Sequence, residues 1–167
     1  MSVDWADVYR ATYEDLVRFL HRKVWDPDRA HDLAQETFMK ALDQQPDNPR
    51  AWLFTVAANL ARDEARSAIR RRKHLTLIKV EESSRAVPDP AEEAEQRERE
   101  DAVRKALDRL SERDRDVLLL WDAGLSYEEI AAETGLAVGA MGTTLARARR
   151  RLVEAYEALE GRDAARG

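Results

Sequence analysis

The chain has 167 residues, of which 44% are hydrophobic and 37% charged, with a formal net charge of −5 and no cysteine. This length accommodates one domain or two small ones, since domains commonly contain about 50–200 residues. The lack of cysteine excludes disulfides and thiolate metal sites, and no uninterrupted apolar run approaches the roughly 18 residues that suggest a membrane span. The first residues do not have the pattern of a secretory signal, so we expect a cytoplasmic protein. Ala, Leu, Arg and Glu dominate the composition, which predicts an all-α fold.

The overall negative charge, taken alone, argues against a nucleic-acid partner, because phosphates attract Lys and Arg. The charges are unevenly distributed along the chain. Basic residues cluster at 70–73 and 147–151, whereas Glu81–Asp101 holds nine acidic and three basic residues. The acidic segment therefore masks two basic helices within a net charge of −5.

The first 75 residues carry three predicted helices. Apolar residues recur at helical spacing over residues 3–24, and Asp26-Pro27 interrupts the pattern. A second helix is predicted over residues 27–42, with one apolar face. The loop 44–49 contains two prolines, each of which disfavours helix in the residue before it. A third helix then starts near Pro49 and continues into the first basic cluster.

Helical periodicity fades between residues 76 and 90, where serines and prolines accumulate. Such a composition is typical of a flexible linker, and the acidic stretch extends it to residue 98. The sequence thus predicts two small helical domains, 1–75 and 99–160, joined by an acidic linker, 76–98. The tail, 161–167, is expected to be frayed.

Two capping signals organise the second domain. Ser111 and Ser126 are each followed three residues later by an acidic residue, as in a capping box, and Gly135 stands where a left-handed residue would end a helix. The signals delimit a short helix over 127–134 and a long helix from near residue 138 toward residue 159. This arrangement predicts a helix-turn-helix, whose second helix presents its first residues to the DNA major groove. The alternative is a helical hairpin with a solvated basic face.

The third predicted helix has a polar stripe beside its apolar one. Its residues recur at helical intervals and are Asn59, Asp63, Arg66 and Arg70. An Asn can pair with a base edge and an Arg with phosphate, and Trp52 and Phe54 are candidates for stacking on an unpaired base. The alternative is an ordinary surface with an Asp63–Arg66 ion pair and a core Trp52.

The second predicted helix also has a polar face, made of Asp32, Gln35, Glu36, Met39 and Asp43. This face is either simply solvated or a docking surface for a basic partner.

Catalytic chemistry has little support in the sequence. The three histidines, His21, His31 and His74, lie on different predicted helices or at a helix end. There is no glycine-rich phosphate loop, and no Ser or Thr has an evident base partner. We therefore expect neither an enzyme nor a metal or cofactor site.

Together these segments resemble the sigma-70 family of bacterial RNA polymerase sigma factors, specifically the extracytoplasmic-function group, which has only the domains called sigma-2 and sigma-4. Residues 32–38 are similar to the family's D-L-x-Q-E-T-F motif, and residues 52–66 to its W-L-x-x-x-A-x-N-x-x-x-D-x-x-R stretch. Residues 110–117 are similar to the L-x-x-R-x-R-x-V opening of sigma-4, and residues 124–131 to its G-x-S-Y-x-E-I-A segment. The resemblance covers nearly the whole chain.

The resemblance implies a non-catalytic initiation factor that binds core polymerase and directs promoter-specific transcription. The second helix would bind the clamp helices of the largest polymerase subunit through Asp32, Gln35, Glu36 and Met39. The third helix would melt and read the −10 element through Trp52, Asn59, Asp63, Arg66 and Arg70, with a flipped base captured by the loop 45–48. The second domain would touch the polymerase flap and read the −35 element, through Tyr127, Gly139, Ala140, Thr143, Thr144, Arg147 and Arg149. An anti-sigma protein is a further expected partner.

One departure concerns the recognition helix. Many relatives have a Lys-Ser-Arg triplet where this chain has Gly142-Thr143-Thr144. With two cations missing, we expect weak DNA binding by this domain alone, although both Thr hydroxyls could donate to phosphate. Two alternatives remain open. A dimeric helix-turn-helix regulator would require palindromic operators and a stable homodimer, and a protein-binding adaptor would show no salt-dependent nucleic-acid binding.

Overall fold

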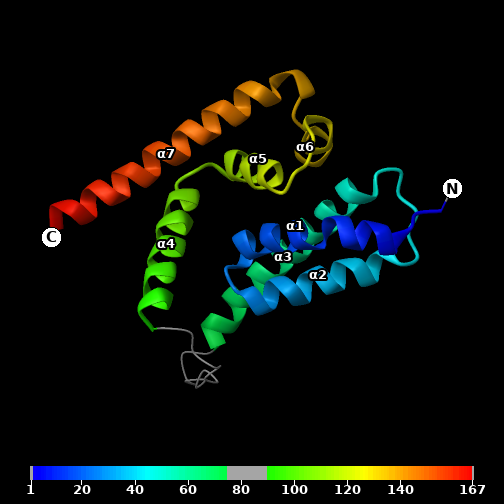
Figure 1. The fold of residues 1–167 in the computed structure, drawn as a ribbon, viewed down its shortest axis with the longest axis horizontal. Coiled ribbons are helices and arrows are strands. Elements are labelled where there is room, and N and C mark those ends of the chain that lie inside the picture. Colours follow the sequence, from blue (N-terminus) through cyan, green and yellow to red (C-terminus); the bar gives the residue numbers. More distant parts are fainter. Residues whose placement is uncertain (1, 75–89, 167) are drawn as a thin grey trace.

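The computed structural model describes residues 2–74 and 90–166, which form seven α-helices and one short 3-10 helix (Figure 1). No strand occurs among these residues, so the predicted all-α fold is confirmed. None of the described helices is both long enough and apolar enough to span a membrane. The elements in chain order are α1 (Trp5–Val24), α2 (Pro27–Ala41), α3 (Pro49–His74), α4 (Pro90–Asp108), α5 (Glu112–Asp122), α6 (Tyr127–Thr134), η1 (Val138–Ala140) and α7 (Met141–Arg166).

Helices α1, α2 and α3 pack together as a bundle, and local signals set where α1 and α2 begin. The Asp4 carboxylate accepts hydrogen bonds from the amides of Ala6 and Asp7 at the start of α1, and these bonds lower the pKa of Asp4. Asp26 caps α2 in the same way, with Pro27 at the first helical position. The centre of the bundle is fully buried and apolar, and includes Leu16, Leu20, Ala34, Leu53 and Phe54.

The helix-turn-helix signals are confirmed in detail. The Ser126 hydroxyl accepts from the Glu129 amide at 3.1 Å, and the Glu129 carboxylate accepts from the Ser126 amide at 2.9 Å. Gly135 ends α6 with φ +76°, in the left-handed region where glycine carries no steric penalty. A helix of eight residues is marginal on its own, so this capping box and the packing of Ile130 are what hold α6 in place.

Three local expectations differ from the structure. Residues 90–98, assigned to the linker from sequence, form the first half of α4, while residues 76–89 of that linker lie outside the described residues. The expected tail is helical, because α7 continues to Arg166. The box at Ser111 is only half formed: its hydroxyl accepts from the Asp114 amide, but the Asp114 carboxylate pairs with Arg151.

The two halves of the molecule lie against each other. Helix α5 contacts α1, and α6 contacts α3 (Figure 1). Buried side chains of both halves belong to one continuous apolar cluster, which includes Phe19 and Leu20 from α1 and Leu120 from α5. The relative orientation of the halves was not predicted from sequence, because it depends on contacts between residues far apart in the chain.

Candidate polymerase and promoter interfaces

The polar face of α2 is exposed as expected. Asp32, Gln35, Glu36 and Met39 all reach the surface, and Met39 is 70% exposed. An exposed Met flanked by carboxylates fits a protein-binding face better than a purely solvated one, since burying Met removes apolar area from water. The four residues therefore form one accessible strip, which we call the α2 docking face.

Two interactions that were not predicted fix this face. Arg29 donates to both carboxylate oxygens of Glu64 on α3, at 2.9 and 2.6 Å, and also to Asp32 at 3.3 Å. The bidentate contact with Glu64 raises the pKa of Arg29 further and ties α2 to α3. On the other side, the Gln35 amide donates to the Tyr13 hydroxyl at 3.2 Å. Gln35 is thus oriented by α1, and Asp32 by Arg29 of its own helix, which is itself held by Glu64 of α3.

The polar stripe of α3 is also at the surface. Asn59, Asp63, Arg66 and Arg70 are exposed, so this part of the predicted −10 site is accessible. The Asn59 side-chain oxygen accepts from Arg62 at 2.9 Å. The oxygen can accept a second hydrogen bond and the amide nitrogen can donate, so Asn59 keeps the groups that would pair with a base edge.

The two aromatic residues proposed for base stacking behave differently. Phe54 is fully buried and packs edge-on against Phe19 at 5.2 Å between ring centroids, so its proposed stacking on a base is wrong. Trp52 is half-buried, with its ring 6.0 Å from that of Trp5. A half-buried ring keeps one edge accessible, so Trp52 stays a candidate for contact with opened DNA.

The loop before α3 is held by the start of the chain. The Val3 amide donates to the side chain of Gln45 at 2.7 Å, and the Trp5 indole donates to the Gln44 carbonyl at 3.1 Å. These two hydrogen bonds to the candidate base-capture loop could not be predicted from sequence, because no local pattern links residues 3–5 to residues 44–45. The one available signal was the large aromatic side chain of Trp5 near the N-terminus.

The helix-turn-helix presents most of the predicted −35 residues. Tyr127, Gly139, Ala140, Thr143, Arg147 and Arg149 are exposed, on α6, on η1 and on the first turns of α7. Thr144 is the exception. It is 5% exposed and its hydroxyl donates to the Ala140 carbonyl at 2.8 Å, so the predicted phosphate contact by Thr144 is wrong.

The arginines of the second basic cluster, residues 147–151, point in different directions. Arg147 projects from α7 into solvent. Arg149 lies over the Trp121 ring of α5, 5.7 Å from its centroid, and Trp121 also packs against Tyr127. Arg151 donates to Asp114 at 2.6 Å, where the carboxylate is almost completely buried. These three arginines are thus a solvent-exposed cation, a cation held on an aromatic surface and one half of a structural ion pair.

Comparison with known proteins agrees with this architecture. Residues 8–72 match the family model described as Sigma-70 region 2, and residues 100–152 match Sigma-70, region 4. The chain is 31% identical over 150 residues to the RNA polymerase sigma factor YlaC of Bacillus subtilis, covering 86% of each chain. It is 37% identical over 131 residues to the ECF RNA polymerase sigma factor EcfG of Rhodopseudomonas palustris, covering 75% of this chain and 70% of EcfG.

Two solved structures share the fold. The sigma factor RpoE of Bartonella quintana, solved in complex with the anti-sigma factor NepR, is 27% identical with a TM-score of 0.63, over 92% of this chain and 97% of RpoE. CnrH, solved in complex with the cytosolic domain of CnrY, is 24% identical with a TM-score of 0.65, over 92% of this chain and 88% of CnrH. With both regions matched and this level of identity to curated relatives, the chain belongs to the extracytoplasmic-function group of the sigma-70 family of RNA polymerase sigma factors.

Proposed function

We propose that this chain binds core RNA polymerase through the α2 docking face and positions it on promoters through α3 and the helix-turn-helix. The main support for the proposal is that one small helical bundle has two accessible polar surfaces. One is the strip Asp32, Gln35, Glu36 and Met39 on α2, and the other is the stripe from Asn59 to Arg70 on α3. The bundle lies within the segment that matches Sigma-70 region 2.

We place the reading of the two DNA elements on different domains, one formed by α1, α2 and α3 and the other by α4 to α7. Helix α3 and the loop 45–48 would stabilise the opened −10 strand. Extruding a base costs a few kcal/mol, which a pocket and phosphate contacts in the polymerase complex would offset. The helix-turn-helix would place α7 on the −35 duplex, with Thr143 and Arg147 on phosphates.

The protein would act without catalysis of its own, in the cytoplasm where core polymerase resides. An anti-sigma protein is a fitting regulator, since the sigma factor RpoE of Bartonella quintana was solved with one. A homodimeric regulator is less well supported, because the docking face and the α3 stripe would have no assigned task in it.

The proposal is tested by binding measurements with purified chain, core polymerase and sheared genomic DNA from the source organism. The chain should bind core polymerase as a monomer and retain a discrete set of DNA fragments only when core is present. A homodimer that retains palindromic fragments without core would favour the regulator instead. A chain that binds proteins but no DNA under any condition would favour the adaptor.

A further inference from the structure

We propose that Tyr13 of α1, supported by His31 of α2, is a positioning residue for polymerase binding, because it holds the Gln35 side chain with its carbonyl oxygen available to a partner. The inference rests on the proposed function, since it concerns how the α2 docking face meets core polymerase. Its basis is a pair of linked hydrogen bonds, one between Gln35 and Tyr13 and the other between Tyr13 and His31.

Helical spacing brings the three side chains together where α1 and α2 pack. His31 and Gln35 are four residues apart, so they lie on the same face of α2. The Tyr13 hydroxyl of α1 is 3.2 Å from Gln35 Nε2 and 3.1 Å from His31 Nδ1. Gln35 and His31 are exposed, whereas Tyr13 is half-buried. The exposed Gln35 is thus linked to a residue that packing can fix.

The ring of Tyr13 is held by aromatic neighbours. It stacks on Tyr9, with 4.6 Å between ring centroids and 26° between the ring planes, and its centroid is 6.2 Å from that of the buried Phe38. These contacts involve the rings and not the hydroxyl. Packing therefore fixes the hydroxyl in space, and loss of the hydroxyl alone would leave the ring contacts intact.

The directions of the two hydrogen bonds follow from the groups involved. The Gln35 amide nitrogen only donates, so the Tyr13 oxygen accepts from it. A phenol has one hydrogen of its own, which Tyr13 can then donate to His31 Nδ1 when that imidazole carries its proton on Nε2. With its nitrogen engaged, Gln35 has its carbonyl oxygen to offer, and this oxygen only accepts.

This arrangement defines the chemistry of the partner surface. The carbonyl oxygen of Gln35 lies on the same exposed face as the carboxylates of Asp32 and Glu36, so the docking face presents acceptors to a partner that supplies donors, such as Arg or Lys. Without Tyr13, the Gln35 amide could turn its N–H groups toward those donors. It would also lose more rotamer freedom on binding, which lowers affinity.

The test measures the Kd for core polymerase by fluorescence anisotropy of the full chain, labelled at its C-terminus. Y13F removes the hydroxyl and keeps the ring, and it should raise the Kd about threefold to tenfold, as expected when one side chain loses its preorganisation. Thermal denaturation should be unchanged, because the ring contacts remain. The matched control is Y9F, which removes a hydroxyl from the ring stacked on Tyr13 and should leave the Kd unchanged.

A double-mutant cycle shows whether Tyr13 acts through Gln35. Q35A should raise the Kd, and adding Y13F to Q35A should change it by less than about 1.5-fold, because the side chain that Tyr13 positions is already gone. An effect of Y13F that persists in the Q35A background would overturn the proposal. An unchanged Kd for Y13F or for Q35A would also overturn it.

Two substitutions of His31 test its support of Tyr13. H31N keeps an acceptor close to the position of Nδ1 and should keep the Kd of the unmodified chain, whereas H31L removes the acceptor and should raise the Kd. Equal Kd values for H31N and H31L would contradict the role of His31. If the unmodified chain does not bind core polymerase, the proposed function itself fails. That failure is distinguishable, because a failure of positioning alone leaves binding by the unmodified chain intact.

Discussion

Arg50, at the start of α3, donates to the main-chain carbonyl of Ala123, at the end of α5. The same Nη2 atom also donates to Asp15 on α1 at 3.1 Å, so one guanidinium joins three helices from both domains. The chain can approach this closely because Gly124 follows, with φ +88° and no side chain. A Cβ atom at Gly124 would lie 3.0 Å from Arg50 Nη2.

Substitution of Gly124 should damage both the turn and the interface. G124A forces a side chain into the left-handed region, which costs about 1–2 kcal/mol, and it also crowds Arg50. G135A is the matched control, because its φ is also positive but nothing lies within 4 Å of an added Cβ. Thermal denaturation should show a similar backbone cost for both variants. The contact between the domains is measured by crosslinking cysteines introduced at positions 55 and 133, because Thr55 of α3 donates to Glu133 of α6. Only G124A should reduce this crosslinking, and equal crosslinking in both variants would argue against the contact with Arg50.

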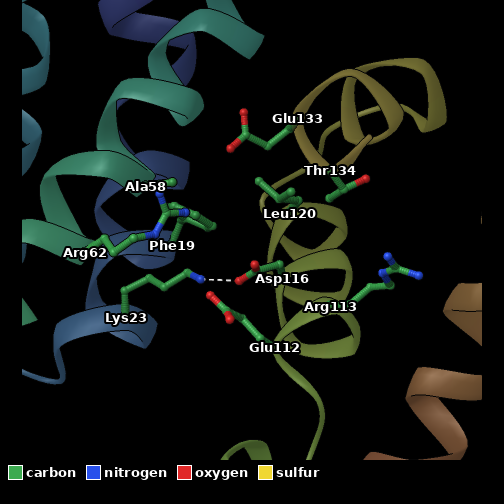
Figure 2. A pocket seen from close by; sticks show the side chains of 10 residues that line it. All are labelled: Phe19, Lys23, Ala58, Arg62, Glu112, Arg113, Asp116, Leu120, Glu133 and Thr134. Atoms are coloured by element: carbon green, nitrogen blue, oxygen red, sulfur yellow. Dashed lines mark hydrogen bonds and ion pairs between the residues drawn. The ribbon is translucent and has the colours of Figure 1, made fainter. Parts of the chain in front are cut away.

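Reversing the charges of the Lys23–Asp116 pair, which joins α1 to α5 (Figure 2), should first separate the two domains and then bring them together again. K23D places two carboxylates opposite each other and should increase the distance between the domains, measured by energy transfer between dyes at residues 7 and 157. The double variant K23D/D116K restores opposite charges and should return the signal toward that of the unmodified chain. The pair is partly exposed, so the effect should shrink at high salt. No difference between K23D and the double variant would exclude a contribution from this pair.

Charge reversal on the α2 docking face should weaken polymerase binding. E36R presents a cation to a partner surface expected to be basic and should raise the Kd for core polymerase at least tenfold, equivalent to about 1.4 kcal/mol. E157R, on the exposed surface of α7, makes the same charge change outside this face and should leave the Kd within about twofold. Fluorescence anisotropy with labelled chain measures both. If E36R binds core polymerase with unchanged affinity, Glu36 does not lie in the interface.

Substitution of Arg147 and of Arg151, both on α7, should have different effects. R147A should weaken retention of promoter DNA by the core complex and reduce the slope of log affinity against log salt by about one, as expected for loss of one phosphate contact. R151A should instead lower stability by about 1–3 kcal/mol, since it leaves the buried Asp114 carboxylate unpaired. Salt titration and urea denaturation distinguish the two effects. A loss of stability in R147A without a change in salt slope would contradict this assignment.

Neutralising the acidic start of α4 should increase binding of DNA by the free chain. Glu92, Glu93 and Glu95 lie at or near the surface, in a segment of strong negative charge. Their replacement by Gln removes repulsion of phosphates without altering size, and should raise polymerase-independent DNA affinity most at low salt. The substitution R97Q/R99Q, on the same helix, removes positive charge and should have the opposite effect. Unchanged affinity of the Gln variant would show that these three carboxylates of α4 do not repel DNA.

The features of the fold that depend on a few neighbouring residues could be predicted from the sequence. The cap at Ser126, the stop at Gly135 and the apolar spacing of α1 and α2 each require only a few consecutive positions. Contacts over long separations could not be read in this way. Arg50 meets Ala123 across 73 positions, and Arg151 meets Asp114 across 37, so no local pattern distinguishes these arginines from surface cations.

The burial of Thr144 could have been foreseen. It lies three residues after Met141 and directly before Leu145, both of which are buried on the inner face of α7. Resemblance to the family drew attention to the polar character of Thr144, whereas helical spacing already placed it at the edge of the apolar face. The same spacing leaves Thr143 outside, as the structure has it.

The central claim is tested most directly by transcription in vitro. Core polymerase from the source organism is incubated with genomic DNA, with and without this chain, and the 5′ ends of the transcripts are mapped. The account predicts a small set of discrete start sites that appear only with the chain and share sequence near positions −35 and −10. Transcripts with the same start sites in both reactions would contradict it.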